Sequence, residues 1–194
     1  MTTGGGWQDQ AGGLTGGIKR VTTQPGLPQR IQVQPLALTE DTAAELDARL
    51  RLVYTGQTRL AKNLLRTVVG RWMARDPEMV WILEEIARLA VVMQEALTAG
   101  DIDGFGELLA AHWALNKRID PGCTNPFIDT LFEAMAPCIC GGKLAGAGGG
   151  GFAIVVARDR RAAQDLTAAL RTQYPGTPVA VWECGIPENG MKVS

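Results

Sequence analysis

The chain has 194 residues, of which 46% are hydrophobic and 20% are charged, so it can bury a core and is a globular protein rather than a disordered one. Its 19 basic and 20 acidic residues give a net charge of −1 and form no basic block that would match a nucleic-acid backbone. The most apolar window, "MVWILEEIARLAVVMQEAL", carries too many charges to cross a bilayer, and "MTTGGGWQDQ" lacks the pattern of a signal peptide. We therefore predict a cytoplasmic protein with neither nucleic-acid nor membrane partners.

The first 50 residues differ from the rest of the chain in composition and in sequence pattern. Residues 2–35 are rich in Gly, Pro, Gln and Thr, and "IKRVTTQ" and "QRIQVQPLAL" show the alternation of short strands. The acidic stretch "LTEDTAAELDARL" follows and is interpreted as a linker. These patterns predict an arm or half-sheet ahead of a separate folding unit.

Helices dominate the middle of the chain. The stretch "LRLVYTG" predicts a short buried strand, which leaves at Thr55 and Gly56 into a helix over residues 58–75. Asp76-Pro77 ends that helix and begins a second one, and Gly100-Asp101 separates the second from a third. His112 lies on the apolar stripe of the third helix, which indicates a core residue. Because His112 is the only histidine and the four cysteines lack paired metal-ligand spacing, we predict no metal site among these residues.

The last third of the chain alternates between helices and strands. In "IDPGCTNPF", Asn125 is the expected helix cap and Pro126 the first helical residue. A short helix to Pro137, a buried strand "GFAIVVA", an amphipathic helix "DRRAAQDLTAALRTQYPG" and a final strand "TPVAVWECGI" follow. This order predicts an α+β fold with an antiparallel sheet under helices.

Two glycine clusters stand out as candidate functional segments. In "KLAGAGGGGF", between the predicted short helix and the buried strand, glycines allow consecutive N–H groups to turn toward one anion, although a flexible tight turn is the alternative. In "TTGGGWQDQAGGL", Asp9 stands between two glutamines and beside a tryptophan. Its alternative role is to stabilise a turn.

Three stretches resemble a known enzyme family in the same order along the chain. "GGGWQDQAGGL", "LVYTGQTRLAKNLL" and "KLAGAGGGGF" are together similar to the C-terminal half of an L-fucokinase-type sugar kinase. That family belongs to the GHMP superfamily, with galactokinase, homoserine kinase, mevalonate kinase and the heptose kinases. The resemblance implies a GHMP-kinase C-terminal domain over 51–194, with a ferredoxin-like antiparallel sheet covered by helices. It also implies that residues 1–50 are a remnant of the N-terminal kinase domain, with an incomplete strand arm and the linker.

The resemblance also implies roles for individual residues. Asp9 matches the catalytic carboxylate that faces the phosphoryl-accepting sugar hydroxyl. With an ordinary pKa near ~3.9 it can orient that hydroxyl and accept its proton late in the transfer. The loop that closes over the phosphates comprises Gly146, Ala147, Gly148, Gly149, Gly150 and Gly151. Expected substrate contacts are Gly6, Trp7, Gln8 and Arg59.

Two of the basic residues have simpler alternatives. Arg59 occupies the matching "TG-x-x-R" position, but an arginine one turn into a helix is also a common partner in solvated salt bridges. Lys117 belongs to a tryptophan-then-lysine pattern seen in heptose and fucose kinases, and it is interpreted as a lysine on an exposed helix face.

The function implied by the resemblance is transfer of the γ-phosphate of ATP, with Mg²⁺, to the anomeric hydroxyl of L-fucose, which gives fucose 1-phosphate. The first and second motifs of the superfamily have no match in the chain. We therefore expect it to need a missing N-terminal half, on the same or a separate chain, and to be inactive alone. The alternatives are heptose 7-phosphate kinase-like activity, a non-catalytic sugar- or phosphate-binding module, and a truncated fragment.

Overall fold

The computed structural model describes residues 7–58, 62–146 and 148–186. The elements in chain order are α1 (Gln8–Leu14), β1 (Lys19–Thr23), β2 (Ile31–Pro35), α2 (Glu40–Arg49), β3 (Leu50–Tyr54), α3 (Lys62–Met73), α4 (Pro77–Ala99), α5 (Ile102–Ile119), the 3-10 turn η1 (Pro121–Cys123), α6 (Pro126–Met135), β4 (Ile139–Leu144), β5 (Phe152–Ala157), α7 (Arg160–Gln173) and β6 (Ala180–Glu183).

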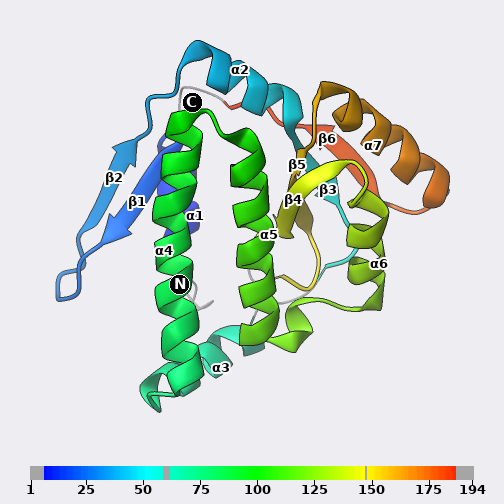
Figure 1. The fold of residues 1–194 in the computed structure, drawn as a ribbon. Helices are drawn as coiled ribbons and strands as arrows, with labels where there is room; N and C mark the ends of the chain where they lie inside the picture. Colours follow the sequence, from blue (N-terminus) through cyan, green and yellow to red (C-terminus); the bar gives the residue numbers. More distant parts are fainter. Residues whose placement is uncertain (1–6, 59–61, 147, 187–194) are drawn as a thin grey trace, which may run out of the picture.

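A four-stranded antiparallel sheet organises the C-terminal part of the chain, with the strand order β4-β5-β3-β6 (Figure 1). β3 lies in the interior of this sheet, where Val53 is opposite Ala153 of β5 and Val181 of β6. The predicted α+β class is confirmed, and the strands expected around Val53, Ile154 and Val181 are in one sheet.

One strand of the sheet is absent from the sequence-based prediction. β4 has the sequence "ICGGKL", whose glycines weaken the strand pattern. These glycines allow close packing, since a Cβ atom on Gly141 would lie 2.0 Å from the carbonyl oxygen of Gly106 in α5. The glycine-rich loop therefore connects two neighbouring strands, β4 and β5, and not a helix and a strand as expected.

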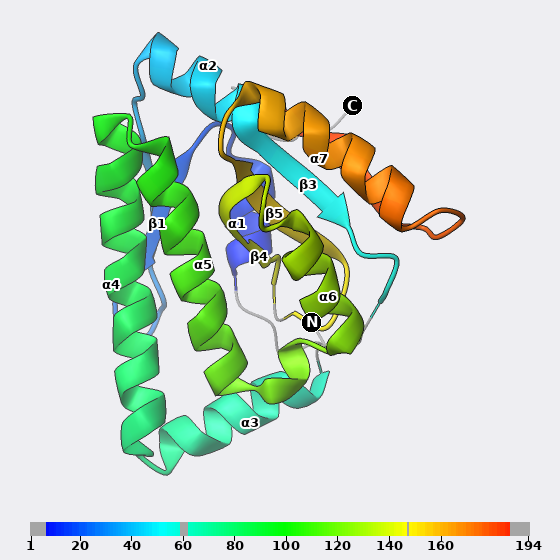
Figure 2. The ribbon, with the colours of Figure 1, turned by 45° about the vertical axis from the view of Figure 1, so that its right-hand side comes forward.

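Helices cover both faces of the sheet (Figure 2). On one face, Val53 and Val155 pack in a core cluster with Ile128 of α6 and Leu166 of α7, all fully buried. On the other face, Val156 packs with residues of α2, α4 and α5. Among the described helices, none combines the length and the apolar character that crossing a bilayer requires.

The segment interpreted as a linker contains helix α2. The Thr39 side chain accepts a hydrogen bond from the Thr42 N–H at the N-terminus, and Glu40 and Asp41 lie in the first turn, where the helix dipole favours negative charge. Leu46 is 2% exposed and packs against the α4–α5 layer. The acidic pattern of the segment does not indicate this buried contact, because the α4–α5 residues that Leu46 packs against are distant in the sequence.

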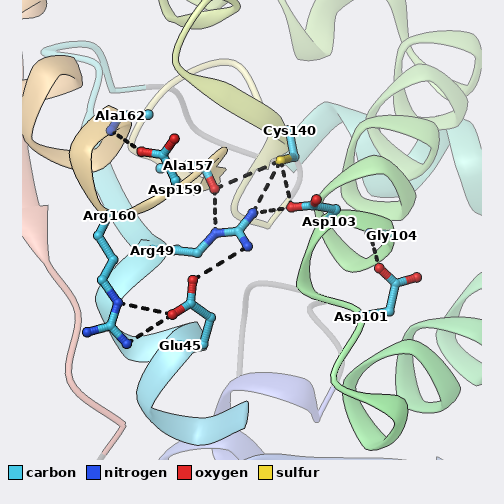
Figure 3. Close-up of polar contacts among 10 residues, drawn as sticks. All are labelled: Glu45, Arg49, Asp101, Asp103, Gly104, Cys140, Ala157, Asp159, Arg160 and Ala162. Carbon is cyan, nitrogen blue, oxygen red and sulfur yellow. Dashed lines mark hydrogen bonds and ion pairs between the residues drawn. The ribbon is translucent and has the colours of Figure 1, made fainter. Parts of the chain in front are cut away.

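Arg49, the last residue of α2, joins four elements of the fold (Figure 3). It is 7% exposed, its Nε donates to the Ala157 carbonyl at the end of β5 over 2.8 Å, and its Nη2 contacts Asp103 of α5 and Cys140 of β4. The hydrogen bond from Arg49 lowers the pKa of the Asp103 carboxyl below its ordinary value. Arg49 therefore fixes the end of β5 against the helical layer.

We predict that Arg49→Met lowers the free energy of unfolding by about 2 kcal/mol, because it leaves the buried Ala157 carbonyl and Asp103 without their charged donor. Arg160→Met is the matched control. Both arginines pair with Glu45, Arg49 at 3.7 Å and Arg160 at 2.9 Å. Because Arg160 is exposed, Arg160→Met should lower the free energy of unfolding by less than about 0.5 kcal/mol. Urea unfolding of both variants measures the difference, and equal losses would contradict a special role for Arg49.

The N-terminal strands form a separate two-stranded sheet. The two short strands that the alternation in the sequence predicts are present, and β1 and β2 pair antiparallel with Val21 opposite Val33. All five residues of β2 are exposed, including the apolar Ile31 and Val33. A two-stranded ribbon has little stability of its own. In this ribbon β1 is mostly half-buried, whereas β2 is exposed along its whole length.

Candidate functional site

The glycine-rich loop between β4 and β5 has a backbone that only glycine adopts readily. The φ angles are +63° at Gly146, +83° at Gly148, +81° at Gly149, +153° at Gly150 and +79° at Gly151. A side chain at any of these positions would be strained. The loop is therefore a specific backbone conformation and not a generic turn.

Hydrogen bonds hold this loop from two sides. The Gly149 N–H donates to the Cys123 carbonyl over 2.5 Å, and the Gly151 N–H donates to the Gln57 carbonyl over 2.7 Å. The Gly151 carbonyl in turn accepts from both the N–H and the hydroxyl of Thr55, at 2.9 and 3.0 Å. Thr55 is fully buried. The exit of β3 and the end of η1 thus define the position of the loop.

The glycines of the loop face two different surroundings. A Cβ atom on Gly148 would lie 2.6 Å from the Cys123 carbonyl oxygen, and one on Gly150 would lie 2.6 Å from the Gln57 carbonyl oxygen. Around Gly146 and Gly151 no described heavy atom lies within 4 Å of the same position. Gly148 and Gly150 are therefore required by packing against the protein, whereas the described residues leave space beside Gly146 and Gly151.

A side-chain bridge runs beside the loop. Asn125 caps α6 as predicted, because its Oδ1 accepts from the Ile128 N–H at 3.0 Å. Its Nδ2 donates to Oε1 of Gln57 over 2.8 Å, across 68 residues of sequence. Gln57 is not among the site residues that the sequence predicts, and its local signal in the sequence is its place directly after the Thr55-Gly56 exit.

The structure places only part of the first glycine cluster. Trp7 is the N-cap residue of α1, and Gln8 and Asp9 are its first two residues. Gly6, Arg59 and Ala147 lie outside the described residues, as does the side chain of Asp9. That Asp9 and the glycine loop meet in one cleft therefore stays a prediction.

His112 of α5 lies near β4, the strand that precedes the glycine loop, and its pKa is lowered. Burial, and then the positive charge of Lys143 on β4, lower the pKa of His112 to about 4. This half-buried, uncharged state agrees with the predicted core role. Among the described residues, no group of three histidine, cysteine or acidic side chains is placed to hold a metal ion.

The family comparison identifies the part of the chain around this loop. The protein-family profile described as GHMP kinases C terminal matches residues 93–176, which include α5, β4, the glycine loop and β5. The chain contains a GHMP kinase C-terminal domain.

Relatives of this GHMP domain include two bifunctional fucokinases. The chain is 44% identical to the bifunctional fucokinase/GDP-fucose pyrophosphorylase of Arabidopsis thaliana over 88% of its length, and 34% identical to the L-fucokinase/L-fucose-1-P guanylyltransferase of Bacteroides fragilis over 100%. It spans 16% and 20% of these two proteins, respectively. The crystal structure of L. major mevalonate kinase with R-mevalonate superposes with a TM-score of 0.65 at 20% identity, covering 84% of this chain and 47% of that one. That likeness shows the fold.

In the GHMP domain, we predict that Gly148→Ala destabilises the protein more than Gly146→Ala. Both positions have positive φ and both variants bear that strain, but only the methyl group at 148 meets the Cys123 backbone. The added overpacking should cost about 1–3 kcal/mol more in the free energy of unfolding. Equal urea-unfolding midpoints for the two variants would show that Cys123 moves away freely.

A second prediction for the GHMP domain concerns acid. The unfolded chain takes up a proton at His112 near its ordinary pKa of about 6.5, whereas the folded protein does so only at about 4. Protonation therefore favours unfolding, so stability is lost as the pH falls from 6.5 toward 4. His112→Gln should flatten the fall in urea midpoint over this window. An unchanged slope would mean that His112 does not contribute.

Proposed function

We propose that the chain is the C-terminal part of a cytoplasmic, ATP-dependent sugar kinase that phosphorylates the anomeric hydroxyl of L-fucose to give fucose 1-phosphate. The observation that carries this proposal is the anchored glycine loop, in a chain 44% identical to a bifunctional fucokinase. The loop is preformed, with its open side at Gly146 and Gly151. The N–H groups of Gly149 and Gly151 donate to the protein, and the remaining backbone N–H groups of such a loop can donate to phosphate oxygens without being ordered first.

In this proposal, Asp9 orients the sugar hydroxyl and accepts its proton late in the transfer. Phosphoryl transfer has a loose transition state that needs little activation of the nucleophile, so an ordinary carboxylate suffices. Trp7 and Gln8, at the start of the same helix, and Gly6 before it, contact the sugar, and Arg59 contacts a phosphate or sugar oxygen. Bound Mg²⁺ would offset charge on the β- and γ-phosphates.

The remainder of the kinase supplies what these residues lack. Since the first and second motifs of the superfamily have no match in the chain, we assign the Mg²⁺ ligands and most of the ATP site to the N-terminal half. Residues 1–50 then belong with that half and residues 51–194 form the C-terminal domain, with α2 packed on the latter. The exposed β1–β2 arm is a surface on which additional strands of the N-terminal half can pair.

The proposal predicts sugar-dependent ATP consumption when the N-terminal half is supplied, either in a longer chain or as a co-expressed partner. With Mg²⁺, L-fucose should be the best substrate among L-fucose, galactose and heptose 7-phosphate, as measured by coupled ADP release. Asp9→Asn keeps the shape of the side chain but removes the proton acceptor, so kcat should fall about 10²-fold with little change in sugar affinity.

Asp165→Asn, the same exchange at an exposed position of α7, is the control and should keep the parent rate. Parent turnover by Asp9→Asn would exclude Asp9 as the catalytic carboxylate. A preference for heptose 7-phosphate would replace fucose by that substrate. Sugar binding without phosphate transfer would favour a non-catalytic binding module.

A further inference from the structure

The orientation of two side-chain amides beside the loop follows from helix capping. Oδ1 of Asn125 must face the Ile128 N–H, because that backbone donor at the start of α6 needs an acceptor. Nδ2 of Asn125 therefore faces Gln57, and Gln57 must present its acceptor, Oε1, to it. The cap of α6 thereby fixes which way the Gln57 amide points.

The donor end of the Gln57 side chain is left available. Among the described residues, Nε2 of Gln57 makes no hydrogen bond. The one buried side-chain nitrogen or oxygen without a partner in that part of the chain is Nε1 of Trp113, so Nε2 of Gln57 is reached by solvent. Two N–H groups of fixed orientation thus remain for a ligand.

These two donors belong to a residue that is part of the loop's own framework. The Gln57 carbonyl accepts from the Gly151 N–H, and its oxygen lies 2.6 Å from the position that a Cβ atom on Gly150 would take. Asn125, at the other end of the bridge, comes two residues after Cys123, whose carbonyl holds the Gly149 N–H. The bridge therefore connects the two segments between which the loop is anchored.

We propose that Gln57 is a ligand-binding residue of the glycine-loop site, whose Nε2 donates to an anionic phosphate oxygen, and that Asn125 is the positioning residue that orients it. The proposal rests on the proposed function for the choice of a phosphate as ligand. It adds a side-chain donor beside a loop in which the N–H groups of Gly149 and Gly151 already donate to the protein's own carbonyls. It also explains why a capping residue of α6 reaches across to the exit of β3.

Two variants separate these roles without removing the cap. Gln57→Glu retains an oxygen for Asn125 but replaces the free donor with a negative charge. Asn125→Asp retains an N-cap of equal quality but cannot donate, so the Gln57 amide must turn its Nε2 toward residue 125. Gln164→Glu, on the exposed surface of α7, is the control for added charge. Thermal unfolding checks that all three variants fold.

The test is a titration of the ¹⁵N-labelled chain with inorganic phosphate, followed by NMR. In the parent, the side-chain amide signals of Gln57 and the backbone amide of Gly151 should shift together with one Kd. Both Gln57→Glu and Asn125→Asp should weaken that Kd at least about tenfold, since a hydrogen bond to a charged group is lost. Gln164→Glu should bind as the parent does.

The inference is overturned if the Gln57 amide signals do not respond to phosphate, or if Gln57→Glu binds phosphate as tightly as the parent. Binding is measured without catalysis, so failure of the kinase assay leaves this result standing. Conversely, an active L-fucose kinase in which Gln57→Glu has the parent's KM for ATP and for sugar would retain the proposed function and remove Gln57 from the site.

Discussion

The pairing of Thr55 with Gly151 is the constraint on which the glycine loop depends. β3 is hydrogen-bonded on both sides, to β5 and to β6, so its last residues have little freedom. Thr55, directly after β3, is fully buried, and its N–H and hydroxyl both donate to the Gly151 carbonyl. The sheet thereby determines where the loop ends, and Gln57, two residues further, continues the same attachment.

β5 is held at both of its ends. At the Phe152 end, the loop is attached to Thr55, while at the Ala157 end the carbonyl accepts from buried Arg49 of α2. α2 also packs Leu46 against the α4–α5 layer. The helical layer and the glycine loop are therefore both attached to the same strand, β5, at its opposite ends. If the loop binds phosphate as proposed, such rigidity would help to position it, since misplacement by about 1 Å can cost about 10²-fold in rate.

The parts of the fold that could be predicted are those whose signals are local. β3, β5, α4, α5 and α7 have clear periodicity and caps, so the sequence indicates them directly. β4 was missed because Gly141 is explained only by its contact with Gly106, a neighbour in space. The linker interpretation missed the helix α2 for the same reason, since Leu46 and Arg49 have distant partners.

In the candidate site, too, local features could be predicted from the sequence, whereas features that depend on distant residues could not. The loop could be recognised from its glycines and from the family resemblance, but the roles of those glycines could not, because Gly148 and Gly150 are required by Cys123 and Gln57. A bulky residue at 148 would meet the protein's own backbone, at the Cys123 carbonyl, before it could meet a ligand. A glycine-rich motif therefore combines two constraints, packing against the protein at some positions and backbone conformation alone at others. Gly146 and Gly151, at the two ends of the loop, have no such neighbour among the described residues, so their positive φ angles are what requires glycine there.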